Sequence, residues 1–112
     1  MGVIAGCGQS SGTGSNDIVI WVQNRDATAT ITVENPSTEE VLFQETDTFS
    51  GLLYPEDGPN TRYTNVFGTE TVRITFDVQD GPKRQKEFSE KEYSEIHVTY
   101  DGSIEWSCRK AV

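Results

Sequence analysis

The chain has 112 residues, enough for one hydrophobic core but not for a second domain. Its 18 acidic and 9 basic residues give a formal charge of −9, which would repel the phosphates of nucleic acid and the anionic head groups of a bilayer. These numbers exclude nucleic-acid binding. No apolar run approaches the ~20 residues that a membrane-spanning helix needs.

The acidic residues are interspersed along the chain rather than gathered into a tail, and only four of the 9 basic residues are lysine. This composition resembles the surface of proteins from salt-loving archaea. An ordinary acidic domain is the alternative, because net charge bears on solubility and association rather than on fold.

Residues 1–16 combine a short apolar patch with Gly, Ser, Thr and Gln, a composition typical of a flexible linker. Within it, the residues Val3 to Cys7 resemble the lipobox of prokaryotic lipoproteins, in which an aliphatic residue and two small residues precede a cysteine. The resemblance implies that Cys7 is the lipidated residue. A signal peptide would have a basic start and a longer apolar stretch than this sequence shows. If the segment is not a lipobox, Cys7 is an ordinary thiol in a flexible tail.

Two strands are predicted next. Residues 18–23 form a continuous apolar run, which indicates a strand covered on both faces. Residues 28–34 alternate between apolar and polar side chains, so one face of that strand should be buried through Ala29, Ile31 and Val33. We expect the two strands to form opposite walls of the core.

A turn follows, formed by Asn35, Pro36, Ser37 and Thr38, because proline presets φ and the short polar side chains cap nearby backbone groups. Residues 40–46 should return as the second strand of a hairpin, with Val41 and Phe43 facing inward. The turn is similar to the loop with which chagasin-type inhibitors occupy the clefts of cysteine proteases, and the resemblance implies an interaction loop. Glu39 departs from that family's pattern, its other two loops are missing, and a simple hairpin turn is the interpretation that we favour.

The middle of the chain alternates between loops and strands. Gly51 interrupts residues 49–54, which indicates a bulge or a crossing segment, and residues 55–60 read as a loop. Residues 62–67 predict a short strand. The strictly alternating segment 71–78 predicts the central strand of a sheet, with four apolar residues on its buried face: Val72, Ile74, Phe76 and Val78. The alternating lysine and arginine side chains of residues 84–88 are typical of an edge strand.

The last part of the chain predicts a second hairpin. Residues 89–92 have the spacing of a capping box and allow one helical turn. Residues 94–100 alternate, with His97 on the solvent-facing side, and Asp101-Gly102 is a strong hairpin signal. Residues 103–109 pair back, with three side chains facing inward: Ile104, Trp106 and Cys108.

Seven or eight such strands predict an all-β fold for residues 17–110, an antiparallel β-sandwich of immunoglobulin or fibronectin type III character, with a small barrel as the alternative. Together, the lipobox-like segment, the linker and the acidic sandwich are similar to small immunoglobulin-like lipoproteins of haloarchaea. This resemblance implies a domain held by a lipid at the extracellular face of the cell membrane. Without the lipobox, the domain would be soluble.

Few residues offer chemistry. A lone solvent-facing His97 provides no Ser-His-Asp arrangement, and copper or zinc would need more histidine and cysteine ligands than this chain has. Glu56, Asp57 and Asn60 are the candidate calcium ligands, with a solvated turn as the alternative. We expect Cys108 to be a small buried apolar side chain, because nothing in the tail's composition favours a bond between Cys7 and Cys108.

These observations predict a monomeric, non-enzymatic, membrane-tethered extracellular module without a cofactor. Its partner would be an unknown protein or another envelope component, and the membrane would be reached only through the N-terminal lipid. The alternative is a soluble protease inhibitor or ligand-binding domain that uses the loops at residues 35–38 and 55–60.

Overall fold

The computed structural model describes residues 17–51, 56, 58–64, 66, 71–88 and 95–109. Their regular elements are eight strands: β1 (Asp17–Val22), β2 (Ala27–Glu34), β3 (Val41–Phe49), β4 (Thr61–Tyr63), β5 (Val72–Val78), β6 (Lys83–Phe88), β7 (Glu95–Tyr100) and β8 (Ile104–Arg109). No helix long and apolar enough to cross a membrane occurs among the described residues.

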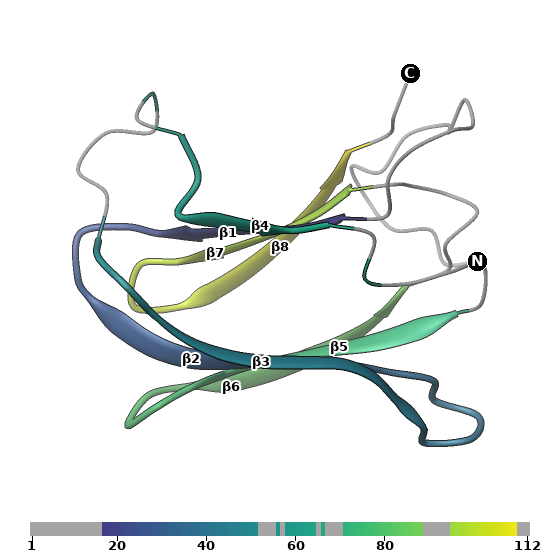
Figure 1. The fold of residues 1–112 in the computed structure, drawn as a ribbon. Helices are drawn as coiled ribbons and strands as arrows, with labels where there is room; N and C mark the ends of the chain where they lie inside the picture. Colours follow the sequence, from purple (N-terminus) through teal and green to yellow (C-terminus); the bar gives the residue numbers. More distant parts are fainter. Residues whose placement is uncertain are drawn as a thin grey trace.

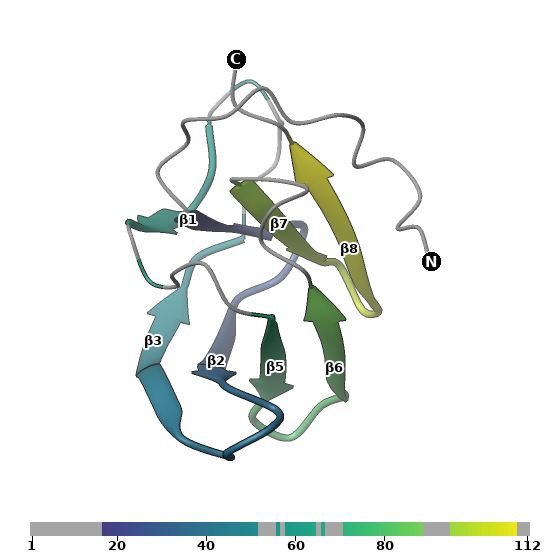
Figure 2. The ribbon, with the colours of Figure 1, turned by 90° about the vertical axis from the view of Figure 1, so that its right-hand side faces the viewer.

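The strands form two four-stranded sheets that lie one above the other (Figure 1). The upper sheet has the order β4-β1-β7-β8 and the lower sheet has the order β3-β2-β5-β6. The predicted β-sandwich of seven or eight strands is therefore confirmed. Figure 2 shows the four strands of the lower sheet side by side beneath β1, β7 and β8.

One pair departs from the antiparallel pattern. β1 and β7 run parallel over their whole length, from Asp17 opposite Glu95 to Val22 opposite Tyr100. The other five pairings between the described strands are antiparallel. Alternation along a strand shows which side chains share a face, but it carries no information about the direction of the neighbouring strand.

The core lies between the two sheets and is built from the apolar half of each alternating pattern. β5 is an interior strand of the lower sheet, and its four apolar side chains are at most 4% exposed. The prediction of an interior strand at residues 71–78 is confirmed, and β2 shares that position. β6 is an edge strand, as its lysine and arginine residues predicted.

The first strand is buried on both faces, as its continuous apolar run predicted. Ile18, Ile20 and Val22 point into the core, whereas Val19 lies on the opposite face and is also fully buried. The outer face of the upper sheet is therefore covered around Val19.

The predicted inward position of Val41 is wrong. A bulge shifts the β2–β3 register between Val33 and Glu34, so that Val33 pairs with Phe43 and Glu34 pairs with Val41. The extra residue turns Val41 to the same side as Glu34, and it is 53% exposed. Phe43 packs against the core, as predicted.

Aromatic pairs close the two long sides of the sandwich. Phe43 of β3 and Tyr63 of β4 have ring centroids 5.2 Å apart, and Phe88 of β6 and Trp106 of β8 have centroids 5.7 Å apart. Each pair joins the edge strand of one sheet to the edge strand of the other. The sheets are therefore connected by ring contacts at both sides of the core.

Backbone geometry requires glycine at two positions. Gly102 has a φ of 109° in the β7–β8 hairpin, which confirms the hairpin predicted at Asp101-Gly102. At Gly51, an added Cβ would lie 2.4 Å from the backbone nitrogen and oxygen of Arg25, so the two segments pass too closely for a side chain. The capping box at residues 89–92 lies outside the described residues.

Candidate functional site

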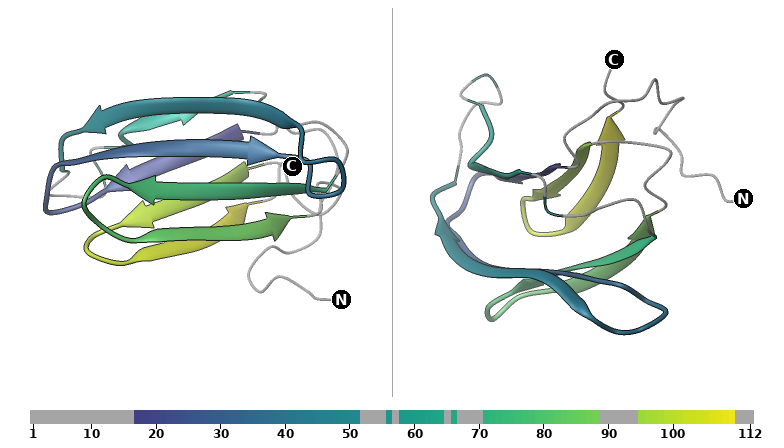
Figure 3. Two further views of the ribbon diagram at one scale, coloured as in Figure 1. Left: turned by 90° about the horizontal axis from the view of Figure 1, so that it is seen from below. Right: turned by 45° about the vertical axis from the view of Figure 1, so that its right-hand side comes forward.

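The outer face of the lower sheet carries a regular array of threonine and glutamine side chains. It comes from the polar half of the alternation in β2, which supplies Thr28, Thr30 and Thr32. Register places Thr48 beside Thr28 and Thr46 beside Thr30. In the left view of Figure 3, seen from below, the four strands that carry this array lie next to one another.

Hydrogen bonds between neighbouring strands hold these side chains in place. The hydroxyls of Thr28 and Thr48 are 2.9 Å apart, and those of Thr30 and Thr46 are 2.7 Å apart. Gln44 donates its amide N–H to the Thr32 hydroxyl at 2.9 Å. A threonine pair uses one donor and one acceptor, so each pair keeps one donor and several lone pairs for a ligand.

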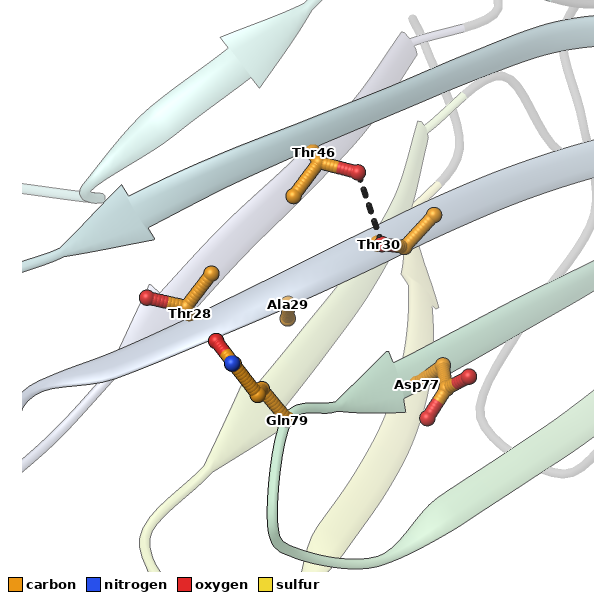
Figure 4. A pocket seen from close by; sticks show the side chains of 6 residues that line it. All are labelled: Thr28, Ala29, Thr30, Thr46, Asp77 and Gln79. Carbon is orange, nitrogen blue, oxygen red and sulfur yellow. Dashed lines mark hydrogen bonds between the residues drawn. The ribbon is translucent and has the colours of Figure 1, made fainter.

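Three of the hollows on the molecular surface lie along this face, with volumes of about 380, 300 and 300 Å³. Figure 4 shows the largest, with Thr30 and Thr46 pointing toward one another and the amide of Gln79 directed toward Thr28. The largest hollow shares Thr28 and Gln79 with one neighbour, and Thr30 and Asp77 with the other. The three hollows therefore lie next to one another, and we call them the threonine trough.

Two of the carboxylates that line the trough have a basic side chain as a neighbour. Asp77 is the register partner of Lys83 on β6. At the other end, the Glu34 carboxylate accepts a hydrogen bond of 3.2 Å from Arg73. Asp77 and Glu34 therefore each have a basic neighbour, although the chain as a whole has a charge of −9. Asp26 and Asp80 line the end that lies next to the β1–β2 turn.

A second polar cluster lies on the outer face of the upper sheet and contains the sole histidine. The Arg62 guanidinium donates to Asp17 at 2.9 Å and to Glu95 at 2.7 Å. Glu95 lies 2.9 Å from Nε2 of His97, and the Trp21 indole donates to Nδ1 of His97 at 2.8 Å. These bonds connect β1, β4 and β7, and we call the five residues the histidine cluster.

His97 is only 8% exposed, so the prediction of a solvent-facing histidine is wrong. Alternation placed it correctly on the outer face, but that face is covered here, and Asp17 beside it is 2% exposed. Because Trp21 donates to Nδ1, the imidazole proton belongs on Nε2, where it is donated to Glu95. Both ring nitrogens are engaged, which leaves His97 without a free lone pair for catalysis.

The contacts within the histidine cluster shift the pKa values of two of its charged side chains. Burial of Glu95 opposes ionisation, but hydrogen bonds from Arg62 and His97 outweigh it, and the pKa of Glu95 is lowered from its ordinary value. The pKa of Arg62 is raised, first by its hydrogen bond to Glu95 and then by the bond to Asp17. The cluster therefore stabilises a charged carboxylate and a charged guanidinium.

The candidate interaction loop is a hairpin turn between β2 and β3. Asn35 uses its side-chain oxygen to accept the backbone N–H groups of Ser37 at 2.8 Å and Thr38 at 3.3 Å. Glu39 has a φ of 64° and donates its backbone N–H to the Asn35 carbonyl at 2.6 Å. The favoured interpretation, a simple hairpin turn, agrees with this geometry. Ser37 and Thr38 are exposed, whereas Asn35 is committed to its own backbone.

The candidate calcium ligands do not share one environment. Asn60 accepts the backbone N–H of Val22 at 2.7 Å and donates to the Ser50 carbonyl at 2.6 Å, so its side chain holds the loop against β1. Glu56 is exposed, and Asp57 lies outside the described residues. Among the residues with described positions, no group of three or more His, Cys, Asp or Glu could hold a metal ion. Calcium binding stays a prediction.

The expectation of an unpaired thiol at Cys108 is wrong, because Cys108 is disulfide-bonded. The other cysteine of the sequence, Cys7, lies outside the described residues. The tail's composition was the basis for expecting no bond. Composition does not determine covalent pairing, because a disulfide can hold a segment that would not otherwise pack.

Comparisons with protein-family models, with curated proteins and with solved structures found no match to this chain. Its function must therefore be argued from its residues. Sequence reasoning missed both the threonine trough and the histidine cluster. The alternating threonines of residues 28–32 were a signal for the trough, but the partners on β3 and β5 follow only from strand order.

Proposed function

We propose that the protein is a non-enzymatic binding module that works outside the cytoplasm and contacts another envelope component through the threonine trough. The observation that carries this proposal is the row of three adjacent surface hollows along one strand. Their walls are hydroxyl, amide and carboxylate groups held in register by the sheet. Such a surface offers many directed hydrogen bonds but little apolar area to bury.

The disulfide at Cys108 supports a location outside the cytoplasm. Disulfides persist in oxidising compartments and are rare where thiol reductants are abundant. The acidic surface is compatible with the same location, because it keeps a secreted domain soluble and repels anionic head groups.

The state of His97 supports a non-enzymatic role. A general base needs an accessible lone pair near the proton that it takes. His97 instead accepts from Trp21 and faces Glu95, and its neighbours Arg62 and Asp17 are paired with each other. The cluster therefore acts as a structural connection between strands.

The lipobox-like segment Val3 to Cys7 supports a membrane anchor at Cys7. The disulfide at Cys108 makes this anchor testable. One sulfur atom cannot form both a lipid thioether and a disulfide. A lipidated Cys7 could not be the disulfide partner of Cys108, whereas a Cys7 bonded to Cys108 would carry no lipid and the protein would be soluble and extracellular. Intact mass, measured before and after thiol alkylation of the unfolded native protein, separates these states. A lipid adduct with one alkylated thiol supports the anchor, and no adduct with no alkylated thiol overturns it.

The test of the binding role is co-sedimentation with envelope fragments of the source cell. Thr30→Arg places a long charged side chain in the middle of the trough, and Thr99→Arg places the same side chain on the outer face of the opposite sheet. We expect the first variant to lose retention on the fragments and the second to keep it, with both variants folded by circular dichroism. Equal retention of both variants would overturn the role of the trough.

A further inference from the structure

We infer that the ligand of the threonine trough is an uncharged, polyhydroxylated chain, that is, a neutral glycan. The inference rests on the proposed function, because it names the partner class of the same surface. It is argued from the hydrogen-bonding groups, the charge and the shape of the trough.

The polar groups of the trough match a ligand made of hydroxyls. Each of the pairs Thr28–Thr48 and Thr30–Thr46 uses one donor internally, so the remaining groups are mostly acceptors. The carboxylate of Asp77 adds further acceptors, and the Gln79 amide supplies both donors and acceptors. A sugar hydroxyl both donates and accepts, so it can satisfy every type of group in this wall. A phosphate or carboxylate ligand could not donate to the acceptors.

The charge of the trough argues against an anionic ligand. Asp77 lies beside Lys83, and Glu34 is paired with Arg73. An anionic polymer would be repelled by the chain's overall charge of −9. Asp26 and Asp80 at one end of the trough would attract a cationic peptide, which is why hexalysine is one of the controls below. An uncharged chain would leave these pairs undisturbed.

The shape of the trough points to a linear ligand. The hollows follow β2, whose eight residues span roughly 25 Å at ~3.3 Å each. Small-molecule pockets are deep and mainly apolar, and stable protein interfaces have an apolar or aromatic centre. The trough is shallow, and its apolar contacts come from threonine methyl groups and from Ala27 and Ala29. An extended polyol that lies along the strand fits these features better than either alternative.

A nitrogen-15 NMR titration of the whole chain tests the inference. The probes are neutral hexasaccharides of glucose, mannose and N-acetylglucosamine, together with hexalysine and hexagalacturonate as charged controls. We expect at least one neutral probe to shift amide signals of β2, β3 and β5 at millimolar concentration. Thr30→Val and Gln79→Ala should each weaken that binding about fivefold, and Thr99→Val should leave it unchanged. Shifts from hexalysine alone, shifts on another face, or no shifts would overturn the inference.

Periodate treatment of the envelope fragments separates this inference from the proposed function. Periodate cleaves vicinal diols of sugars, whereas protease removes proteins. If Thr30→Arg abolishes retention, and retention of the wild type is lost only after periodate, the result supports a glycan partner. Retention that needs the trough and is lost only after protease overturns the glycan inference but keeps the binding role. Retention that does not depend on the trough overturns both.

Discussion

The indole N–H of Trp21 donates a 2.8 Å hydrogen bond to Nδ1 of His97, and the two rings stack with centroids 6.0 Å apart and planes inclined by 18°. Trp21 lies on β1 and His97 on β7, which are the two parallel strands of the sandwich. The contact therefore reinforces the one parallel pairing among the described strands. It also directs the Nε2 proton of His97 to Glu95.

Replacement of His97 should destabilise the fold. His97→Ala would leave the Trp21 indole N–H without its acceptor in a partly buried position, and it would remove one hydrogen bond to Glu95. We expect a loss of about 1–3 kcal/mol in the free energy of unfolding, measured by urea denaturation. Thr99→Ala, two residues along the same face, is the matched control and should cost clearly less. Equal losses would contradict a structural role for the histidine cluster.

Acid should weaken the fold through Glu95, whose pKa is below its ordinary value of 4.5 in the folded state. Between the folded pKa and 4.5, the unfolded chain binds the proton that the folded chain does not, so stability rises with pH in this window and is lost as pH falls through it. Glu95→Gln should therefore flatten the dependence of the urea midpoint on pH below about 4.5. The same slope in the wild type and this variant would show that other carboxylates dominate.

Alkali should weaken the contact between the sheets at Tyr63. Burial raises the pKa of Tyr63 above its ordinary 10.0, and its hydrogen bond to Asp47 and the charges of Asp47 and Glu45 raise it further. Above pH 10 the unfolded chain releases a proton that the folded chain retains, so stability is present below this pH and is lost as pH rises. Tyr63→Phe should be less stable at pH 7 but should lose less between pH 10 and higher pH, measured by urea denaturation. A steeper loss in the variant would argue against this assignment.

The two faces of β5 should respond differently to polar substitution. Ile74 is fully buried, so Ile74→Asp would bury an unpaired carboxylate and cost several kcal/mol, enough to unfold a domain with a stability of ~5–15 kcal/mol. Arg73 lies on the outer face between Glu34 and Glu87. Arg73→Gln should cost about 1 kcal/mol at most, because it removes partly exposed ion pairs. Thermal melts that rank the two variants in the opposite order would mean that the strand is flipped.

Salt should raise the melting temperature. The charge of −9 opposes compaction, and the Debye length shrinks from ~30 Å at 0.01 M salt to ~3 Å at 1 M, so screening should relieve the repulsion. Sodium and potassium chloride should act alike. A rise confined to millimolar calcium would instead support the ligands Glu56, Asp57 and Asn60. A melting temperature that is constant from low to molar salt would remove the self-repulsion argument.

The turns and faces of the strands were predictable because they depend on neighbouring residues. Alternation at residues 28–34 and 71–78 identified the buried side chains, and Asp101-Gly102 identified a hairpin through its backbone preference. Val41 was misplaced because one bulge reverses every side chain beyond it.

The sequence by itself determined the fold class, the composition of the core and the net charge, since a period of two and a count of residues are local properties. Only the tertiary structure decided that β1 runs parallel to β7, that His97 is buried against Trp21, and that Thr46 and Asp77 lie on either side of Thr30. These relationships join residues from 16 positions apart, as for Thr30 and Thr46, to 78 positions apart, as for Asp17 and Glu95. Strand order creates them, and an alternating pattern is the same whichever strand lies beside it.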